Sequence, residues 1–179
     1  QLNDTHPALG IAEMMRLLVD VHGIEWAAAW RITIATFAYT NHTLLPEALE
    51  TWPVSLMERM LPRHMQIIYL LNGGHLEHVK AQGPVDDELL MTLSIIDERH
   101  GRRVRMGHLA FLGSHSINGV SALHTGLMQK TVFRELNAQY GGRINNKTNG
   151  VTFRRWLHRA NPGLTGLLVD KLGPRVLLD

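Results

Sequence analysis

Three short segments of this chain have the pattern of a strand that ends in a dense polar motif and is followed by a helix. They are "TFAYTNHT" (36–43), "SHSINGV" (114–120) and "RINNKTNGV" (143–151). Strands that alternate with helices are typical of an α/β fold. We therefore predict a helix-rich α/β fold with short parallel strands. In open sheets of this kind, ligands bind at the carboxyl ends of the strands, where these polar motifs fall.

Apolar periodicity predicts helices around these strands. Apolar side chains recur at helical spacing over residues 11–19, 25–36 and 63–82, and one long helix is predicted over 120–139. The sequence "NGG" at 72–74 should weaken the third helix, because an interior glycine costs about 1 kcal/mol relative to alanine.

Shorter elements are predicted between the long helices. A turn at Pro46 is expected to start a short helix with Glu47 and Glu50 on one side of it. Two short strands are expected in the second half of the chain, the later one after a turn at His100-Gly101: "TLSII" (92–96) and "RRVRM" (102–106).

Composition bounds the class of protein. With 179 residues, an apolar fraction of 45% and no cysteine, the chain suits one domain, or one layer of a larger one, that needs no disulfide. It shows no secretory leader and no run of about 18 apolar residues, so we predict a cytoplasmic protein with no membrane partner. For the same reason the sequons at Asn41 and Asn146 are not expected to carry glycans. The chain opens at Gln1, inside the motif "QLNDTHP", which favours a segment cut from a longer protein.

The charge pattern argues against a nucleic-acid partner. The formal net charge is only +2, and the basic residues form a short run at 99–105 rather than an extended stripe. A nucleic-acid footprint calls for a larger excess of positive charge interleaved with aromatic residues.

The three polar junctions share asparagine, histidine and glycine. Amides and imidazoles both donate and accept hydrogen bonds, and glycine allows close approach of the backbone, which suits a neutral hydroxylated ligand. For any one junction taken alone, turn chemistry is the preferred explanation. Three junctions at strand ends favour a binding site.

Other patterns lead to weaker hypotheses. His75 and His78 stand one helical turn apart, but no third ligand completes a metal site, so a solvated helix face is preferred. Glu47 and Glu50 have the residue type of a glycosidase acid and base, but a polar helix face explains their spacing more simply. No glycine-rich phosphate loop is present.

Four long motifs closely resemble the α-glucan (glycogen, starch, maltodextrin) phosphorylases. They are "QLNDTHPALGIAEMMRLL", "FAYTNHTLLPEALETWPVSLMERMLPRHMQIIY", "GSHSINGVSALH" and "NKTNGVTFRRWL…NPGL", and in this order they extend over essentially the whole chain. The resemblance implies that residues 1–179 form the latter part of the family's N-terminal domain. The family fold is a glycosyltransferase (GT-B-like) fold of two Rossmann-like halves, and its C-terminal cofactor domain is absent here.

The resemblance also implies an activity. Enzymes of this family transfer the terminal glucosyl unit of an α-1,4-glucan to orthophosphate and give glucose 1-phosphate with retention of configuration. They carry pyridoxal phosphate and use its phosphate group for proton transfer. The complete enzyme is expected to be a homodimer.

Seven residues take roles from the resemblance. His42 matches the histidine that contacts the glucosyl unit at the catalytic site, and Asn149 matches the asparagine that binds the sugar 6-hydroxyl. Val120 matches the valine that packs on the sugar, and Trp156 matches a tryptophan near the cofactor. The remaining three match polar residues beside the glucose: Asp4, His6 and Glu50.

The chain departs from the family pattern in several ways. Phe153 stands where the family usually has proline, and Gly73-Gly74 interrupts the long helix. The cofactor lysine of the family follows Gly-Asn-Met in the C-terminal half, and no lysine here follows methionine. We therefore expect the isolated segment to be inactive, to bind no pyridoxal phosphate and to self-associate. Two alternatives stay open, a non-catalytic carbohydrate-binding remnant and an α-glucan hydrolase.

Overall fold

The computed structural model describes residues 1–99 and 101–178, and of Pro46 it describes only the backbone. His100, in the predicted turn before the second short strand, lies outside the described residues. The chain divides into two compact units, residues 1–147 and residues 148–179.

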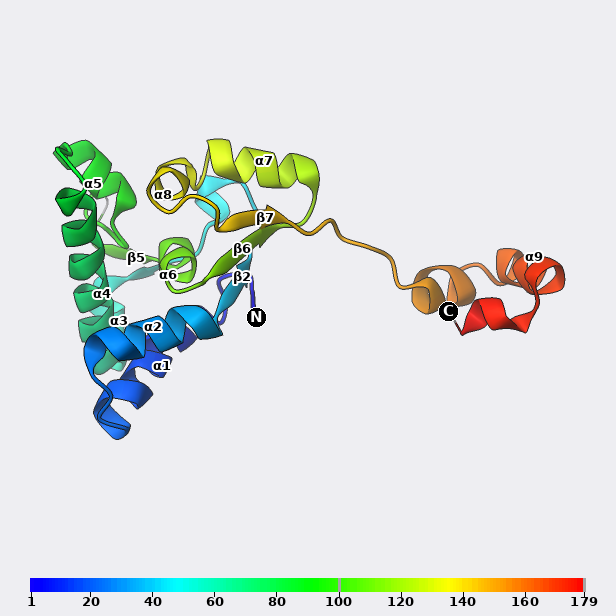
Figure 1. Cartoon of the computed structure of the whole chain (residues 1–179), viewed down its shortest axis with the longest axis horizontal. Coiled ribbons are helices and arrows are strands. Elements are labelled where there is room, and N and C mark those ends of the chain that lie inside the picture. Colours follow the sequence, from blue (N-terminus) through cyan, green and yellow to red (C-terminus); the bar gives the residue numbers. More distant parts are fainter. Residues whose placement is uncertain (100, 179) are drawn as a thin grey trace. The chain divides into compact units, whose positions relative to one another are not determined.

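A four-stranded parallel sheet lies at the centre of the first unit. Its order is β1 (Leu2–Asn3), β2 (Ala38–Thr40), β6 (Ser116–Gly119) and β7 (Ile144–Asn146). The prediction of short parallel strands is confirmed, with Tyr39 paired to Ile117 and Ile117 paired to Ile144. Figure 1 shows helices α7 (Ala122–Lys130) and α8 (Arg134–Gln139) on one side of these strands and α1 (Gly10–Arg16) and α2 (Trp26–Thr36) on the other.

A second sheet is antiparallel, and its pairing was not predicted, although the strand predicted within 102–106 is confirmed as one of its members. It consists of β3 (Thr51–Pro53), β5 (Arg103–Arg105) and β4 (Ile96–Asp97), in that order. The expected strand over 92–96 is largely wrong, because α5 (Asp87–Leu93) extends into it. The Asp86 side chain begins this helix by accepting a hydrogen bond from the Leu89 N–H at 2.7 Å.

Three other helix predictions need correction. α4 (Pro62–Ala81) runs unbroken through Gly73 and Gly74. It follows the short helix α3 (Val54–Met60). The segment that starts at Pro46 is only a 3₁₀ turn, Pro46–Ala48, so Glu50 is not on a helix. The helix predicted over 11–19 is α1, which begins at Gly10 and passes at Leu17 into a π-helical segment, Leu17–Val21.

The predicted helix over 120–139 is two helices, α7 and α8. The break falls at Thr131, whose ψ is −94°, in a β-branched sequence that is a poor helix former. It allows Phe133 to enter the core, where its ring centroid lies 5.4 Å from that of Phe111. Burial of an aromatic ring outweighs a few lost helical hydrogen bonds.

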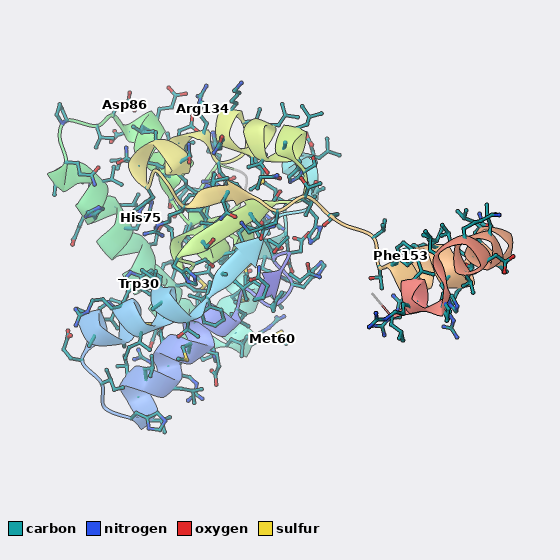
Figure 2. All side chains as sticks on the ribbon, turned by 45° about the vertical axis from the view of Figure 1, so that its right-hand side comes forward. Trp30, Met60, His75, Asp86, Arg134 and Phe153 are labelled. Atoms are coloured by element: carbon teal, nitrogen blue, oxygen red, sulfur yellow. The ribbon has the colours of Figure 1, made fainter. Side chains whose placement is uncertain are left out.

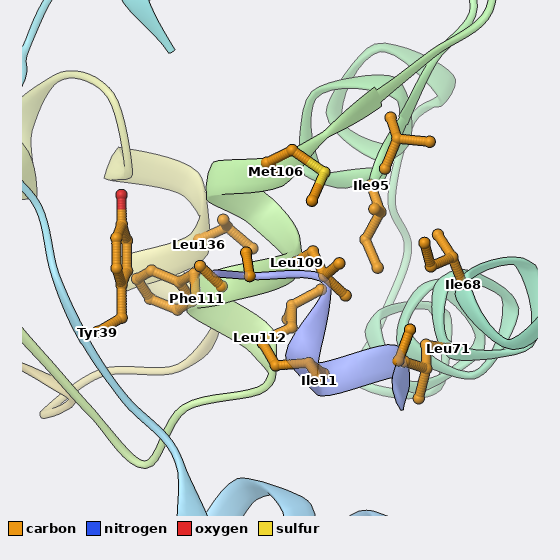
Figure 3. Close-up of a cluster of buried hydrophobic side chains, with 14 of the residues drawn as sticks. Ile11, Tyr39, Ile68, Leu71, Ile95, Met106, Leu109, Phe111, Leu112 and Leu136 are labelled. Carbon is orange, nitrogen blue, oxygen red and sulfur yellow. The ribbon is translucent and has the colours of Figure 1, made fainter. Parts of the chain in front are cut away.

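The core of the first unit surrounds α6 (Met106–Leu112). Every residue of this helix except His108 is buried. Figure 3 shows its side chains between Ile11 and Tyr39 on one hand and Ile68, Leu71 and Ile95 of the α4 and α5 region on the other. A helix that is apolar on all sides must lie inside the fold. This core fixes the sheet and its two flanking helix layers.

The second unit is a short helical segment. It contains a π-helical turn (Arg154–Arg159), α9 (Pro162–Leu172) and a 3₁₀ turn (Pro174–Leu177). Asn161 caps α9 by accepting a hydrogen bond from the Leu164 N–H at 3.1 Å. None of its described residues is buried.

Candidate functional site

The parallel sheet brings three predicted site residues to one edge. Asp4 follows β1, His42 follows β2 and Val120 follows β6. Because all four strands run the same way, these positions lie together at the carboxyl edge of the sheet. The motif "QLNDTHP" therefore lies beside the polar motifs after β2 and β6 across neighbouring strands, although β1 is only two residues long.

Asp4 makes a tight turn where β1 ends. Its φ is +66°, in the left-handed region that aspartate tolerates better than most side chains. The carboxylate accepts a hydrogen bond from the Thr5 N–H at 2.7 Å, and the Asp4 N–H donates to the Thr40 carbonyl at 2.9 Å. This turn reverses the chain toward α1, and His6 is exposed on it.

His42 is exposed, and one of its ring nitrogens is oriented by a neighbour. Its Nε2 lies 2.7 Å from Asn3 Oδ1. An amide oxygen only accepts, so the imidazole donates from Nε2, which leaves Nδ1 of the neutral ring as an acceptor. The ring can thus accept a hydrogen bond from a ligand hydroxyl.

A buried network holds the backbone just before His42. The Asn41 side chain is fully buried, donates to the Tyr39 hydroxyl at 3.0 Å and accepts from His124 Nε2 at 2.9 Å. Its main-chain N–H donates to the Asn118 carbonyl at 3.0 Å. Burial also raises the pKa of Tyr39, which keeps the phenol protonated as a hydrogen-bonding partner. With both ends of its amide engaged, Asn41 is a structural residue and no glycan acceptor in the folded chain.

Glu50 is held by two donors. Thr5 Oγ1 donates to one carboxylate oxygen at 2.7 Å, and Trp52 Nε1 donates to the other at 2.9 Å. The first bond ties Glu50 to the turn after β1. Glu50 also lines a pocket of about 350 Å³ whose other lining residues are Leu49, Thr51, Thr92, Asp97, Arg99, Arg105, Gly107, His108, Thr131, Val132, Glu135 and Leu136.

That pocket does not contain the rest of the predicted site. Asp4, His6, His42 and Val120 are not among its lining residues. Burial, and then the charge of Arg105, lower the pKa of His108 to about 3, so this histidine is neutral at ordinary pH. Arg105 in turn forms an ion pair with Asp97 at 3.2 Å. These contacts describe a structural cluster under the antiparallel sheet.

The glycine before Val120 has a packing role. A Cβ built on Gly119 would come 2.9 Å from the Thr125 Cα of α7, which is closer than real Cβ atoms come to a backbone. Glycine is therefore required for α7 to pack against β6. The sequence argument that glycine permits close approach is correct in kind, but here the approaching group is a helix of the same chain.

Asn149 and Trp156 belong to the second unit. Asn149 is exposed in the segment after β7, and Trp156 is 62% exposed on the π-helical turn. The other five predicted residues belong to the first unit. Phe153 precedes this turn with a φ of −52°, which is within the range that proline adopts.

Sequence reasoning missed several residues that orient the candidate site. Asn3 positions His42, Thr5 and Trp52 hold Glu50, and His124 completes the Asn41 network. Asn3 and Thr5 lie inside the polar motif "QLNDTHP" and could have been suspected from it. His124 gave no signal, since its partner Asn41 is 83 residues away in sequence and buried. Trp52 lies only two residues from Glu50, but no sequence motif marked that contact.

Two kinds of site are not found in the part of the chain that the structure describes. No three histidine, aspartate or glutamate side chains there are grouped so that they could hold a metal ion. Within the same residues, no helix has both the length and the apolar character needed to cross a bilayer.

The chain matches the carbohydrate phosphorylase family over residues 1–179, and it belongs to the α-glucan phosphorylases. It is 51% identical over 179 residues to the brain form of glycogen phosphorylase of Homo sapiens, a match that covers 100% of this chain and 21% of that protein. It is 49% identical, with the same coverage, to the liver form of glycogen phosphorylase of Bos taurus. The chain thus spans about a fifth of the length of these relatives.

Proposed function

We propose that this chain supplies the glucose-binding side of the active site of an α-glucan phosphorylase. The complete enzyme would transfer the terminal α-1,4-linked glucosyl unit of a glucan to orthophosphate and release glucose 1-phosphate with retention. In this proposal residues 1–179 are the latter part of the N-terminal half of a two-domain, GT-B-like enzyme. We further propose a cytoplasmic location and, for the complete enzyme, a homodimer.

The observation that carries the proposal is the set of groups at the carboxyl edge of the parallel sheet. Asp4, His42 and Val120 follow neighbouring strands, and Asn3 and the Asn41 network orient the His42 segment. Neutral donors and acceptors beside an apolar side chain suit a sugar, which offers hydroxyls at its rim and C–H groups on its faces. Family membership supports the same reading.

The roles of individual residues follow from this arrangement. His42 would accept a hydrogen bond from the glucosyl unit through Nδ1, and Val120 would pack on the sugar. Asp4, His6 and Glu50 would line the space beside it. Rate enhancement would come from orientation of the sugar and from hydrogen bonds that are already in place before it binds. Thr5 and Trp52 would keep the Glu50 carboxylate fixed.

Pyridoxal phosphate, which the resemblance implies, does not fit the residues of this chain. A lysine that forms an imine is activated by desolvation or by a neighbouring cation. Lys80, Lys130, Lys147 and Lys171 are all exposed, and Lys147 Nζ donates to Asn145 Oδ1 at 2.9 Å. We propose that a lysine outside these residues holds the cofactor, near Trp156.

If the proposal is correct, the isolated chain catalyses no phosphorolysis. Purified residues 1–179, incubated with pyridoxal phosphate, glucan and phosphate, should form no stable aldimine absorbance and release no glucose 1-phosphate. Product analysis of the complete enzyme separates the two remaining alternatives. Free glucose released without phosphate would favour a hydrolase, and glucan binding without turnover would favour a binding remnant.

Asn149 provides the sharpest test, in the complete enzyme that contains this segment. If its amide binds the sugar 6-hydroxyl, Asn149→Ala removes a hydrogen bond worth about 1–3 kcal/mol. We expect kcat/KM for glucose 1-phosphate in the synthetic direction to fall roughly tenfold to a hundredfold. Activity on xylose 1-phosphate, which lacks the hydroxymethyl group, should change little, so the preference for glucose shrinks.

Asn161→Ala is the matched control for this experiment. It removes another asparagine of the second unit, one that caps α9, and should leave the ratio of the two rates unchanged. If Asn149→Ala lowers both rates together, Asn149 shapes its loop and does not contact the hydroxyl.

A further inference from the structure

A second pocket, of about 410 Å³, lies in the first unit between α2 and α4. It combines aromatic and apolar walls with a single arginine. Figure 2 labels Trp30 of α2 and His75 of α4, which both belong to it. Its lining residues are Trp26, Trp30, Ile34, Leu70, Leu71, Gly74, His75, His78, Leu112, Tyr140 and Arg143.

This pocket is separate from the candidate sugar site. Leu112 and Arg143 come shortly before β6 and β7, at the amino edge of the parallel sheet. Asp4, His42 and Val120 follow their strands, at the carboxyl edge. The pocket shares no lining residue with the candidate sugar site or with the pocket beside Glu50.

The charge of the pocket is positive and has no carboxylate partner, although the Arg143 guanidinium lies over the Tyr140 ring, 4.8 Å from its centroid. Arg143 is half-buried, and no ion pair to a carboxylate is found for it among the described residues. Its Nη1 lies 3.4 Å from the Leu112 carbonyl and 3.3 Å from the Ser114 carbonyl, both long for hydrogen bonds. Burial lowers the pKa of the Arg143 guanidinium, as expected for a cation partly removed from water. An arginine stays charged at neutral pH, so this group lacks a counter-ion.

The other titratable groups in the pocket do not balance that charge. None of its described lining residues is acidic. His75 is neutral at ordinary pH, because burial lowers its pKa to about 4. Its ring nitrogens already have partners, the Tyr140 hydroxyl at 2.7 Å and the Leu93 carbonyl at 3.1 Å. His78 is exposed and stacks on Tyr140 with ring centroids 5.9 Å apart.

The walls of the pocket favour a flat apolar body. Trp26, Trp30 and Ile34 follow one another at single-turn spacing on α2, and leucines of α4 and α6 complete the apolar surface. Neither indole N–H has an acceptor in the part of the chain that the structure describes. Planar rings that stack against indoles gain dispersion energy over a large area at little cost in side-chain entropy.

Gly74 leaves the pocket open. A Cβ built on this helical residue would meet no atom within 4 Å, so packing does not require glycine there. Helix propensity argues against glycine at the same position. A side chain at 74 would stand in the pocket. The neighbouring Gly73 also has open space around its Cβ, but it does not line the pocket.

We propose that this pocket binds a small planar organic anion, such as an aromatic carboxylate. The anionic group would pair with Arg143, and the ring would lie against Trp26 and Trp30. A carboxylate matches the planar guanidinium and would supply the missing counter-charge. The site lies at the edge of the sheet opposite the candidate sugar site and does not depend on the function proposed above.

The test uses the 179-residue chain with 2-naphthoate as the probe and 2-naphthamide as its neutral isostere. Indole N–H signals in ¹⁵N-resolved NMR spectra, assigned by Trp→Phe variants, report binding residue by residue. We expect 2-naphthoate to shift the signals of Trp26 and Trp30 but not that of Trp52. The Kd of 2-naphthamide should be at least roughly tenfold higher, because it cannot form the charge-assisted pair. In Arg143→Gln this difference should disappear.

Gly74→Leu and Gly73→Leu form a matched pair. Both replace a glycine with open space by a better helix former, so both should fold. Gly74→Leu fills the pocket and should abolish binding of 2-naphthoate, whereas Gly73→Leu should bind it like the parent chain. Equal effects of the two variants would overturn the proposal. So would no binding by the parent chain at millimolar probe, or equal binding of acid and amide.

Discussion

In residues 1–147, buried apolar side chains from the helices and both sheets form one cluster, whereas residues 148–178 contain no buried side chain at all. The second unit has apolar residues, but it exposes them: Val151 by 79%, Trp156 by 62% and Leu172 by 67%. Segments shorter than about 40 residues rarely bury enough surface to fold alone. The first unit thus carries its own core, and the second depends on another surface for stability.

This difference bears directly on the proposed site. His42 and Glu50 are oriented by hydrogen bonds within the first unit. Asn149 and Trp156 lie in the unit that has no core. In the proposed site, their geometry would therefore be set by contacts beyond that unit's own fold.

The largest difference in the free energy of unfolding is expected between two leucine-to-alanine substitutions, one in each unit. Leu109→Ala, at a position with 0% exposure, should lower the free energy of unfolding of the first unit by about 2–5 kcal/mol. Leu167→Ala, in the second unit at a position 53% exposed, should change that free energy of unfolding by less than about 0.5 kcal/mol. Urea titration monitored by circular dichroism measures both. Comparable losses would mean that the two units unfold as one.

Buried histidines should make the first unit sensitive to acid. The pKa of His75 is lowered from 6.5 to about 4 by burial, so the folded state keeps this ring neutral while the unfolded state binds a proton. Its contribution to stability is complete above pH 6.5 and is lost as the pH falls toward 4, by up to about 3 kcal/mol.

His75→Gln keeps a polar side chain that cannot titrate, and it should flatten the dependence of the unfolding free energy on pH within that window. Chemical denaturation at pH 7, 6, 5 and 4 tests this. An unchanged pH dependence would assign the acid sensitivity to other groups, among which is His108, with its pKa lowered to about 3.

Removal of residues 148–179 separates stability from association. No residue of the core belongs to that segment, so the unfolding free energy of residues 1–147 should change by less than about 1 kcal/mol. Self-association of the whole chain, measured by light scattering after gel filtration, should decrease because exposed apolar residues are removed. If the shortened chain loses its cooperative transition, the two units are interdependent.

The smallest effect is expected at Phe153. Its φ of −52° already suits proline, the residue usual in the family, and the side chain is 40% exposed. Phe153→Pro should therefore change the unfolding free energy by less than about 0.5 kcal/mol and leave the far-UV circular dichroism spectrum unaltered. A loss of helical signal would show that the π-helical turn needs the Phe153 N–H or side chain.

Three strands of the parallel sheet, β2, β6 and β7, could be predicted from sequence because each is a short local segment followed by a polar motif. The two-residue strand β1 was not predicted. Tyr39 and Ile117 are fully buried where the alternation of apolar residues places them. The helical break at Thr131 was missed because it depends on the burial of Phe133 against residues distant in sequence. The same holds for β3 and β4, whose pairing through β5 is not recorded in their own short sequences.

The residue types of the candidate site could be predicted from sequence. The residues that hold its side chains in place were harder to predict. A polar motif at a predicted strand end pointed to His42, whereas Asp4 came from the family resemblance. The helix that was expected to carry Glu47 and Glu50 did not form, and Glu50 is held by Thr5 and Trp52, which come from opposite sides of it in the sequence. The bond from Thr5 spans 45 residues and so has no local pattern from which it could be inferred.

The order of the parallel sheet also determines when this chain can fold. Its central strands, β2 and β6, bring together Thr40 and Asn118, which are 78 residues apart in sequence. Contacts of such long range form late, because the entropy of loop closure must be lost before the contact is gained. On a ribosome, the β2 segment would leave the exit tunnel long before its partner. Helices α1 to α5 would form first, and the sheet would assemble only after α6 and β6 had been synthesised.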